Sequence, residues 1–263
     1  MSLFTLITIG FFTSVLIMCI AWLACVRLKN AGWVDVVWAY SIGLLSIGYF
    51  FLSDISAISP LGLGLIMIWS SRLGSHLAIR IATEPEDGRY LELKRKWGGP
   101  KSPKLFGFFM IQALAAFLFS LPALIAIRNT DGAWSSNEWI AVTIAAIAII
   151  GESISDWQLK TFKTIPSNKG KVCKNGLWRY SRHPNYFFEW IFWFSFVAVS
   201  FHTSAVWTLL AAPAIMLFLV LKVTGIPPTE AQAIRKRGDL YKQYQKETSA
   251  FVPWFPKSKS SQT

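Results

Sequence analysis

The chain has 263 residues, of which 53% are hydrophobic and 15% aromatic, while only 15% are charged. Because soluble globular proteins carry roughly 25% charged residues, this composition excludes an ordinary soluble domain and indicates an integral membrane protein. The formal net charge is +12, which we attribute to membrane topology and anionic lipid and not to nucleic-acid binding. The three cysteines indicate neither a disulfide framework nor a metal cluster.

Seven apolar runs are long enough to span roughly 30 Å of hydrocarbon and predict an all-α protein with seven transmembrane helices. The runs lie near residues 3–25, 33–52, 60–80, 105–127, 138–158, 185–203 and 205–223. No basic residue precedes the first run, so we expect a retained helix and not a cleaved signal peptide. We expect one membrane domain over residues 1–263.

The basic residues predict the orientation of these helices. Most of them fall on one side of the predicted spans, in the first connection and in segments 81–104, 159–184 and 224–256. By the positive-inside rule, these segments are cytoplasmic, the N-terminus is outside and the C-terminus is cytoplasmic. The predicted membrane is a bacterial inner membrane or the endoplasmic reticulum, with a cofactor site that faces the cytoplasm.

The densest polar stretch, residues 176–189, precedes the sixth run and contains two arginines, a histidine, an asparagine, two tyrosines and a glutamate. Pro184 favours the first turn of a helix, whose free N–H groups attract an anion such as a phosphate. The cofactor-binding candidates here are Arg182, His183, Asn185, Tyr186 and Glu189. An interfacial anchor is the alternative, although an anchor needs neither the asparagine nor the glutamate.

Ionisable residues also occur within the predicted spans, where they normally face a cavity or a partner. Arg72 and His76 are four residues apart and share one face of the third helix. Asp35 lies near the cytoplasmic entrance of the second helix, where desolvation keeps a carboxyl group protonated unless a cation compensates. Asp35 could pair with Arg72 or donate a proton to a bound substrate, and the sequence leaves both open.

Two further segments are charged. Segment 84–97 predicts a turn at Asp87-Gly88 followed by a short helix, and segment 228–244 predicts a helix with Thr229 as N-cap that ends near Gly238. Their alternatives are a solvated connection and a peripheral amphipathic helix. Lysines after the fifth run form a cationic rim suited to a phosphate-rich ligand. The further cofactor-binding candidates are Arg72, His76, Arg89, Asp156, Lys160, Lys163, Lys171, Glu230, Arg235, Tyr241 and Tyr244.

Residues 180–189, taken with Glu86–Tyr90, 156–163 and 244–253, resemble the steroid 5α-reductase-like branch of membrane reductases. The resemblance implies a seven-helix fold in which NADPH enters from the cytoplasm and the 4,5 double bond of a 3-oxo-4-ene steroid is reduced. It assigns to NADPH the positions Asp156, Lys163, Arg182, Asn185 and Glu189, with Arg72 facing the same pocket.

The chain departs from the family pattern at the expected carbonyl site. Asp35 stands where the family has a glutamate, and Trp69, which cannot donate a phenolic proton, stands where it has a tyrosine. Asp35 and Tyr40 are therefore the predicted catalytic residues, with Trp69 and Trp38 as substrate-binding residues. We expect Asp35 to hold the carbonyl oxygen while hydride adds to the β carbon of an enone.

The Arg-His-Pro-x-Tyr element and the tail are also similar to those of isoprenylcysteine carboxyl methyltransferases and related lipid methyltransferases, which use S-adenosylmethionine. Those enzymes commonly have fewer spans and no counterpart of Glu86–Tyr90. We expect NADPH as cofactor, a small hydrophobic substrate and membrane lipids as partners, and a monomer. A seven-helix transporter or sensor fits less well because repeated halves are not found.

Overall fold

The computed structural model describes residues 1–54, 59–128, 134–201 and 203–257. Apart from an isolated parallel bridge between Ser181 and Ser249, the regular structure of these residues is helical, which confirms the all-α prediction. Five helical segments are long and apolar enough to cross a membrane, in agreement with an integral membrane protein. These are Leu3–Leu28, Trp33–Leu52, Pro103–Arg128, Ser136–Thr164 and Val206–Arg237.

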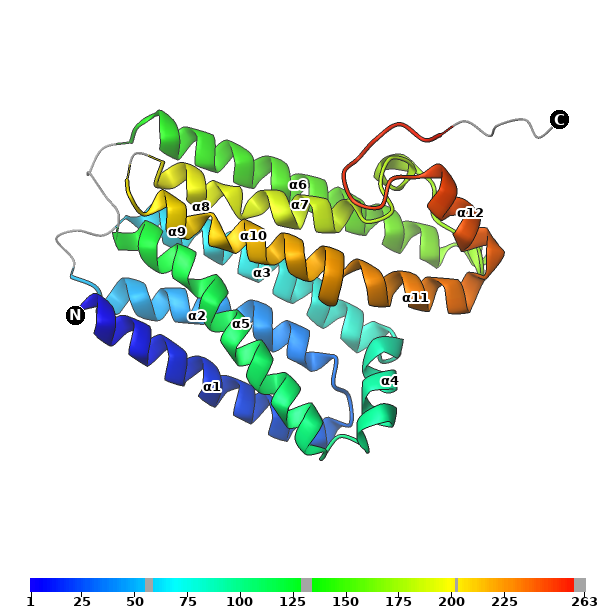
Figure 1. Cartoon of the computed structure of the whole chain (residues 1–263), viewed down its shortest axis with the longest axis horizontal. Helices are drawn as coiled ribbons and strands as arrows, with labels where there is room; N and C mark the ends of the chain where they lie inside the picture. The colour runs from blue at the N-terminus through cyan, green and yellow to red at the C-terminus, as the bar shows by residue number, and fades with distance from the viewer. Residues whose placement is uncertain (55–58, 129–133, 202, 258–263) are drawn as a thin grey trace. The chain divides into compact units, whose positions relative to one another are not determined.

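The contacts divide the chain into two compact units, and the first comprises residues 1–139 and 198–212. Helix α2 packs against α3, and α5 contacts α1, α2 and α3 (Figure 1). The short helix α4 also contacts α5 and lies across the ends of its longer neighbours (Figure 1). The helices of this unit are α1 (Leu3–Leu28), α2 (Trp33–Leu52), α3 (Pro60–Thr83), α4 (Gly88–Trp97), α5 (Pro103–Arg128) and α9 (Val206–Leu209).

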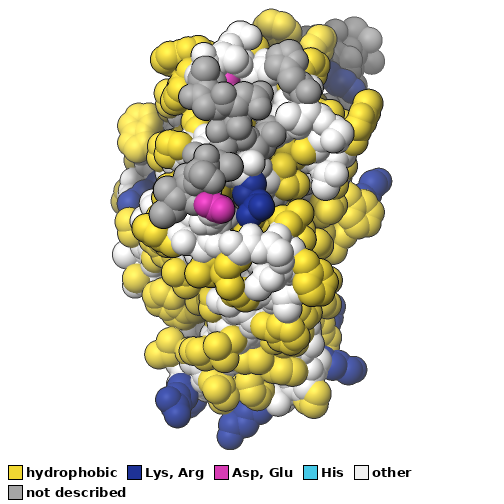
Figure 2. Space-filling view, turned by 90° about the vertical axis from the view of Figure 1, so that its left-hand side faces the viewer, with side chains coloured by type: hydrophobic (Ala, Val, Ile, Leu, Met, Phe, Trp, Pro, Cys, Tyr) yellow, Lys and Arg dark blue, Asp and Glu magenta, His cyan; other side chains and the backbone are white. Residues whose placement is uncertain are grey.

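Small and hydroxyl-bearing residues bring the helices of the first unit close together, as is common where lipid removes the hydrophobic driving force. A Cβ placed on Gly62 of α3 would lie 2.9 Å from the backbone nitrogen of Ile127 on α5. The Ser70 hydroxyl of α3 donates to the carbonyl oxygen of Ala39 on α2 at 2.8 Å. Many other large apolar side chains, such as Phe4, Phe12 and Phe51, are exposed, and hydrophobic side chains cover much of the face drawn in Figure 2.

The second unit comprises residues 140–197 and 213–263. In it, α11 packs against the π-helical turn that precedes it and against α12. Short 3-10 turns lie at Pro166–Asn168 and Gly176–Arg179. The remaining elements are, in chain order, α6 (Ser136–Thr164), α7 (Pro184–Phe192), α8 (Phe194–Val199), α10 (Ala211–Phe218), the π-helix Leu219–Val223, α11 (Ile226–Arg237) and α12 (Asp239–Glu247). Of these, α6 and α10 begin in the first unit.

Several predicted boundaries differ from those observed. The sixth run is interrupted at Trp193 between α7 and α8, and the seventh is divided among α9, α10 and the π-helix. Thr229 lies inside α11 and not at its N-cap, because prolines at positions 227 and 228 fit the first turn of a helix that begins at Ile226. The predicted turn and short helix in segment 84–97 are confirmed as α4.

Candidate functional site

A polar cluster in the first unit surrounds the carboxylate of Asp35, which lies in the first turn of α2. The Tyr90 hydroxyl donates to Oδ1 of Asp35 at 2.5 Å, and Nη2 of Arg89 lies 3.8 Å from Oδ2. The pairing of Asp35 with Arg72 that the sequence allowed is replaced by these two partners. We call Asp35, Asp87, Arg89 and Tyr90 the Asp35 cluster.

The start of α4 holds this cluster in place. Asp87 is the N-cap of α4, and its carboxylate accepts from the backbone N–H of Arg89 at 2.9 Å and from the Arg89 guanidinium at 3.1 Å. Burial favours the neutral form of Asp87, but the charge and hydrogen bonds of Arg89 outweigh it, so the pKa of Asp87 lies below its ordinary value. Asp87 therefore remains ionised and orients Arg89.

Tyr90, like Asp87, is a residue of this cluster that the predicted site omitted. Its side chain is buried, and burial together with the Asp35 carboxylate raises the pKa of Tyr90 well above its ordinary value. The phenol therefore stays protonated at physiological pH and acts as a hydrogen-bond donor. Its position within Glu86–Tyr90 was the only signal in the sequence, because the pairing depends on how α4 packs.

Glu86 fixes α4 to the connection between α1 and α2. Its Oε1 accepts from the backbone N–H of Ala31 at 2.8 Å, and its Oε2 lies 2.5 Å from Nζ of Lys94. Lys94 also donates to the carbonyl oxygen of Lys29 at 2.8 Å. Both charged side chains of this pair are at most 14% exposed, so the pair holds α4 beside the start of α2.

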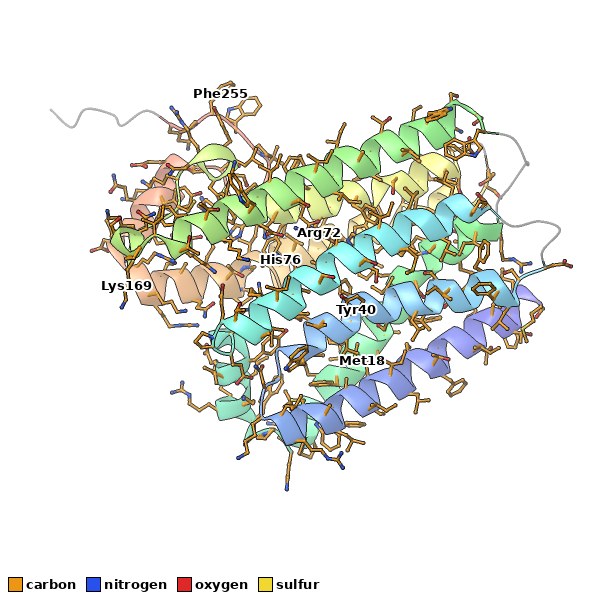
Figure 3. All side chains as sticks on the ribbon, turned by 180° about the vertical axis from the view of Figure 1, so that it is seen from behind. Met18, Tyr40, Arg72, His76, Lys169 and Phe255 are labelled. Carbon is orange, nitrogen blue, oxygen red and sulfur yellow. The ribbon has the colours of Figure 1, made fainter. Side chains whose placement is uncertain are left out.

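The other predicted residues of the first unit lie on α2 and α3. Trp69 is fully buried and packs edge-to-face on Trp38, so Trp69 fills the core of the unit. Tyr40 is 42% exposed and shares a hydrogen bond with Ser75 at 3.0 Å. Arg72 and His76 lie one turn apart on α3, as Figure 3 shows, which confirms only that they share a face.

A second cluster lies in the second unit, around Glu230 of α11. Glu230 Oε1 accepts from Nε of Arg182 at 2.6 Å and lies 3.2 Å from Nε2 of His183. The Tyr241 hydroxyl approaches the same oxygen at 3.4 Å, while Gln245 donates to Oε2 at 2.6 Å. We call Arg182, His183, Glu230, Tyr241 and Gln245 the Glu230 cluster.

Arg182 has a structural task in this cluster. Beyond its ion pair, its Nη1 donates to the carbonyl oxygens of Gln245 at 2.9 Å and Thr248 at 2.6 Å. These carbonyls lie at the end of α12, where helices leave acceptors without partners. Arg182 therefore caps α12, and two of its three guanidinium nitrogens already have acceptors within the protein.

His183 and the tyrosines complete this packing. His183 stacks on Tyr186 with ring centroids 5.3 Å apart, and burial lowers the pKa of His183 below its ordinary value although Glu230 opposes the shift. Tyr244 is buried and donates to the carbonyl oxygens of Trp178 and Ser181. The structure thus gives Tyr244 a role in fixing the 176–184 segment.

Residues 249–257 close over this segment. The backbone N–H of Arg182 donates to the carbonyl oxygen of Ser249 at 2.8 Å, and the Ser181 hydroxyl donates to that of Phe251 at 2.7 Å. The N–H of Trp254 donates to the carbonyl oxygen of Tyr180 at 2.9 Å. Neither Ser181 nor Gln245 was predicted, because such side chain and backbone pairings leave no mark on sequence periodicity.

A smaller polar group joins α6 to α7. The amide nitrogen of Asn185 donates to Oδ1 of Asp156 at 3.2 Å, whereas Oδ1 of Asn185 is buried and accepts no hydrogen bond. Glu189, one turn further along α7, accepts from the indole of Trp193 at 3.1 Å. An orphaned buried oxygen is costly, so Asn185 is the residue here whose hydrogen bonding a ligand would complete.

The predicted basic residues of the second unit line its surface. Lys160, Lys163, Lys171 and Arg235 are all exposed, and Arg237 donates to the carbonyl oxygen of Lys171 at 2.8 Å. The predicted residues thus fall into four groups: those of the Asp35 cluster, those elsewhere on α2 and α3, those packed around the Glu230 cluster and the Asn185 pair, and exposed cations.

Comparison with known proteins yields a family and a relative. The chain is 26% identical over 282 residues to the uncharacterised protein C594.04c of Schizosaccharomyces pombe, an alignment that covers 93% of this chain and 79% of the relative. No solved structure matches the chain significantly. Residues 21–248 match the family described as "Protein of unknown function (DUF1295)", which is grouped with the steroid 5-alpha reductase-like families. The chain therefore belongs to the DUF1295 family.

Proposed function

We propose that this protein is an NADPH-dependent membrane reductase that saturates the double bond of a lipid enone such as a 3-oxo-4-ene steroid. The observation that carries the proposal is the hydrogen bond from Tyr90 to Asp35 at 2.5 Å, with Arg89 beside it. The resemblance of the sequence to steroid 5α-reductase-like enzymes and the grouping of its family support the same reaction class.

Reduction of an enone requires a hydrogen-bond donor at the carbonyl oxygen. NADPH, when bound, supplies the hydride that the β carbon of an enone accepts. Negative charge then moves onto the carbonyl oxygen, where a donor in a buried site stabilises it. The Tyr90 hydroxyl becomes such a donor when it turns its single proton from Asp35 to the carbonyl oxygen, while Arg89 remains beside the Asp35 carboxylate. Protonation of the α carbon by solvent restores the carbonyl and completes the addition of two hydrogens.

The residues of the second unit fit part of NADPH. The orphaned oxygen of Asn185 and the carboxylate of Asp156 are acceptors that suit the hydroxyl and carboxamide donors of a dinucleotide. The exposed Lys160 and Lys171 suit its phosphates. Arg182 is left out of this set because its donors already serve Glu230 and α12.

The test is calorimetric binding of NADPH, NADH and S-adenosylmethionine to the detergent-purified protein. We expect NADPH to bind more tightly than NADH. We also expect Asn185→Ala to weaken NADPH binding more than the matched control Asn175→Ala does, because Asn175 is exposed and outside the proposed site. Oxidation of NADPH by enone steroids is then followed at 340 nm. Binding of S-adenosylmethionine alone would contradict the reductase.

A methyltransferase that uses S-adenosylmethionine is the second candidate. The ion pair of Arg182 with Glu230 favours this candidate. The pair leaves one cation fewer for the phosphates of NADPH, whereas S-adenosylmethionine carries no phosphate. Against it, transfer of a methyl group to a carboxylate has no use for the donor pair of Tyr90 and Asp35. Methylation of a prenylated cysteine peptide by the purified protein would decide in its favour.

We also propose seven membrane crossings with the N-terminus outside. The basic residues of segments 81–104, 159–184 and 224–256 support this orientation. Single-cysteine variants Ser2→Cys and Lys257→Cys, made after replacement of the native cysteines, test it with a membrane-impermeant thiol reagent. Labelling of position 2 from outside and of position 257 only after permeabilisation is expected, and the reverse would overturn the orientation.

A further inference from the structure

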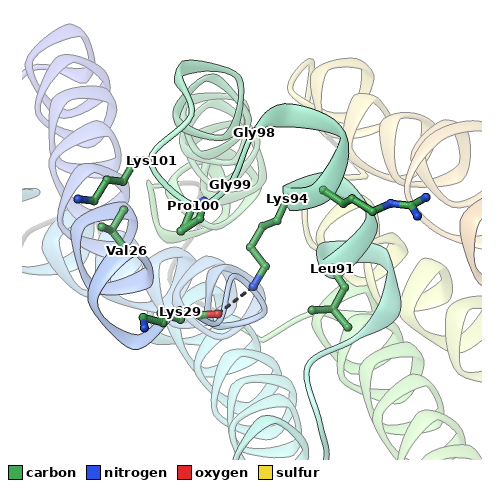
Figure 4. A pocket seen from close by; sticks show the side chains of 9 residues that line it. Val26, Lys29, Leu91, Lys94, Gly98, Gly99, Pro100 and Lys101 are labelled. Carbon is green, nitrogen blue, oxygen red and sulfur yellow. Dashed lines mark hydrogen bonds between the residues drawn. The ribbon is translucent and has the colours of Figure 1, made fainter.

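A surface pocket of about 640 Å³ lies beside the end of α1, along α4 and at the turn that follows α4. Four of its lining residues are cations, namely Lys29, Lys94, Arg95 and Lys101, and its apolar wall includes Val26 and Leu91 (Figure 4). All of these residues belong to the first unit. None of them belongs to the Asp35 cluster.

The cations of this pocket differ in whether they have an acidic partner. Lys94 extends towards the carbonyl oxygen of Lys29 (Figure 4) and is paired with Glu86. The side chains of Lys29, Arg95 and Lys101 are exposed and have no acidic partner among the described residues. Three cations without counter-ions around one hollow make a site that favours an anion.

Opposing charges do not cancel this excess. The carboxyl ends of α1 and α4 lie here, and each helix end carries at most about half a negative charge. At α4 that end is already capped, because Gly98 and Gly99, both with positive φ, direct their N–H groups to the carbonyl oxygen of Lys94. The acidic residues of this region are paired with other lysines, Glu86 with Lys94 and Glu92 with Lys96, so the pocket keeps a net positive charge.

Exposed leucines lie on the same two helices as the pocket. Leu91 of α4 is 50% exposed, and Leu23 and Leu28 on the last turns of α1 are 55% and 61% exposed. Because α1 is a candidate membrane span, its exposed leucines face acyl chains. A ligand of this site therefore needs an anionic head and an apolar tail.

We propose that this pocket binds the phosphate headgroup of an anionic phospholipid, whose acyl chains lie along the exposed leucines of α1 and α4. Lys29 and Lys101 contact the phosphate, and Lys94 remains with Glu86 and anchors α4. The site is separate from the proposed reductase chemistry. It serves to fix α4, and with it the N-cap Asp87, at the membrane surface.

Native mass spectrometry of the detergent-purified full chain, titrated with phosphatidylglycerol or phosphatidylcholine, tests the proposal. The variant is Lys29→Gln/Lys101→Gln, and the matched control is Lys236→Gln/Lys246→Gln, which removes the same charge from exposed positions of α11 and α12. We expect phosphatidylglycerol to bind the wild type more tightly than phosphatidylcholine. We expect the pocket variant to bind phosphatidylglycerol on the order of 30-fold more weakly, and the control to bind as the wild type does.

Three outcomes would overturn the proposal: equal binding of the two lipids, equal loss in the control variant, or displacement of phosphatidylglycerol by an equal concentration of inorganic phosphate. The last would mark a site for free phosphate. Melting temperatures in lipid-free detergent report folding. If the double variant melts lower than the wild type, Lys101→Gln alone, which leaves the end of α1 unchanged, must reproduce a several-fold loss.

Discussion

The Nε atom of Arg182 lies 2.6 Å from Oε1 of Glu230, and the two side chains are only 10% and 12% exposed. The same guanidinium reaches the carbonyl oxygens of Gln245 and Thr248. One arginine thus joins the segment before α7 to α11 and to the end of α12. Its removal leaves a mostly buried carboxylate without its arginine cation and two carbonyl oxygens without the donor that Arg182 supplies.

Arg182→Ala is therefore expected to destabilise the protein by about 3 kcal/mol, since breaking a buried pair leaves an uncompensated charge. Lys174→Ala is the control, because Lys174 pairs with Glu247 at 2.7 Å but is 40% exposed and such pairs contribute less than about 1 kcal/mol. Thermal unfolding in detergent measures both. Equal melting temperatures for the two variants would refute the structural role of Arg182.

Two glycines of α3 give a matched test of helix packing. A Cβ on Gly62 would lie 2.8 to 3.0 Å from Ala126 and Ile127 of α5, partly against backbone, whereas a Cβ on Gly64 would meet no atom within 4 Å. Gly62→Ala should cost about 1–3 kcal/mol through overpacking. Gly64→Ala should leave the melting temperature unchanged or slightly higher. A Gly62→Ala variant as stable as the wild type would show that α3 and α5 are less close than described.

The role proposed for Tyr90 predicts a catalytic defect without a binding defect. Loss of one donor at a developing oxyanion costs about 100-fold or more in kcat, so Tyr90→Phe should lower enone reduction by that amount and leave the affinity for NADPH unchanged. Tyr40→Phe, which removes an exposed hydroxyl paired with Ser75, should retain most activity. If Tyr40→Phe were the inactive variant, the donor would be Tyr40, one of the two catalytic residues that the sequence predicted.

His183 predicts how stability depends on pH. Burial lowers its pKa in the folded protein, while the unfolded chain takes up the proton near the ordinary value of about 6.5. Between these two values the unfolded state binds more protons, so the contribution of His183 is present above about pH 6.5 and is lost as pH falls below it. Melting temperatures between pH 7.5 and 5.5 should fall more steeply for the wild type than for His183→Gln; parallel curves would exclude His183 as the source.

The sequence predicted the helical class and α4 because the signals are local. Apolar length marks the long helices, and Asp87-Gly88 marks the start of α4. The break at Trp193 could not be foreseen, since residues 185–203 contain no internal proline or glycine. Thr229 was preferred as an N-cap on residue type, but the prolines before it already begin the helix.

The candidate site was predicted by residue type and less well by role. Asp35 was singled out, yet its partner Tyr90 is 55 positions away, and only the packing of α4 joins them. Arg182 was predicted to bind a phosphate, since a basic residue before a helix start favours that role. The deciding fact is that Glu230 lies within 2.6 Å, which no spacing in the sequence reveals.

The hydrogen bonds from residues 180–182 to residues 249–254 also set an order of events during synthesis. The ribosome makes Arg182 long before its acceptors on Gln245 and Thr248 exist, so this arginine stays hydrated until they emerge. The Glu230 cluster can close only when the stretch through Gln245 has emerged, and the bond of Ser181 to Phe251 forms later still. A nascent chain stalled before that point would carry an open, charged segment that quality-control proteases can recognise.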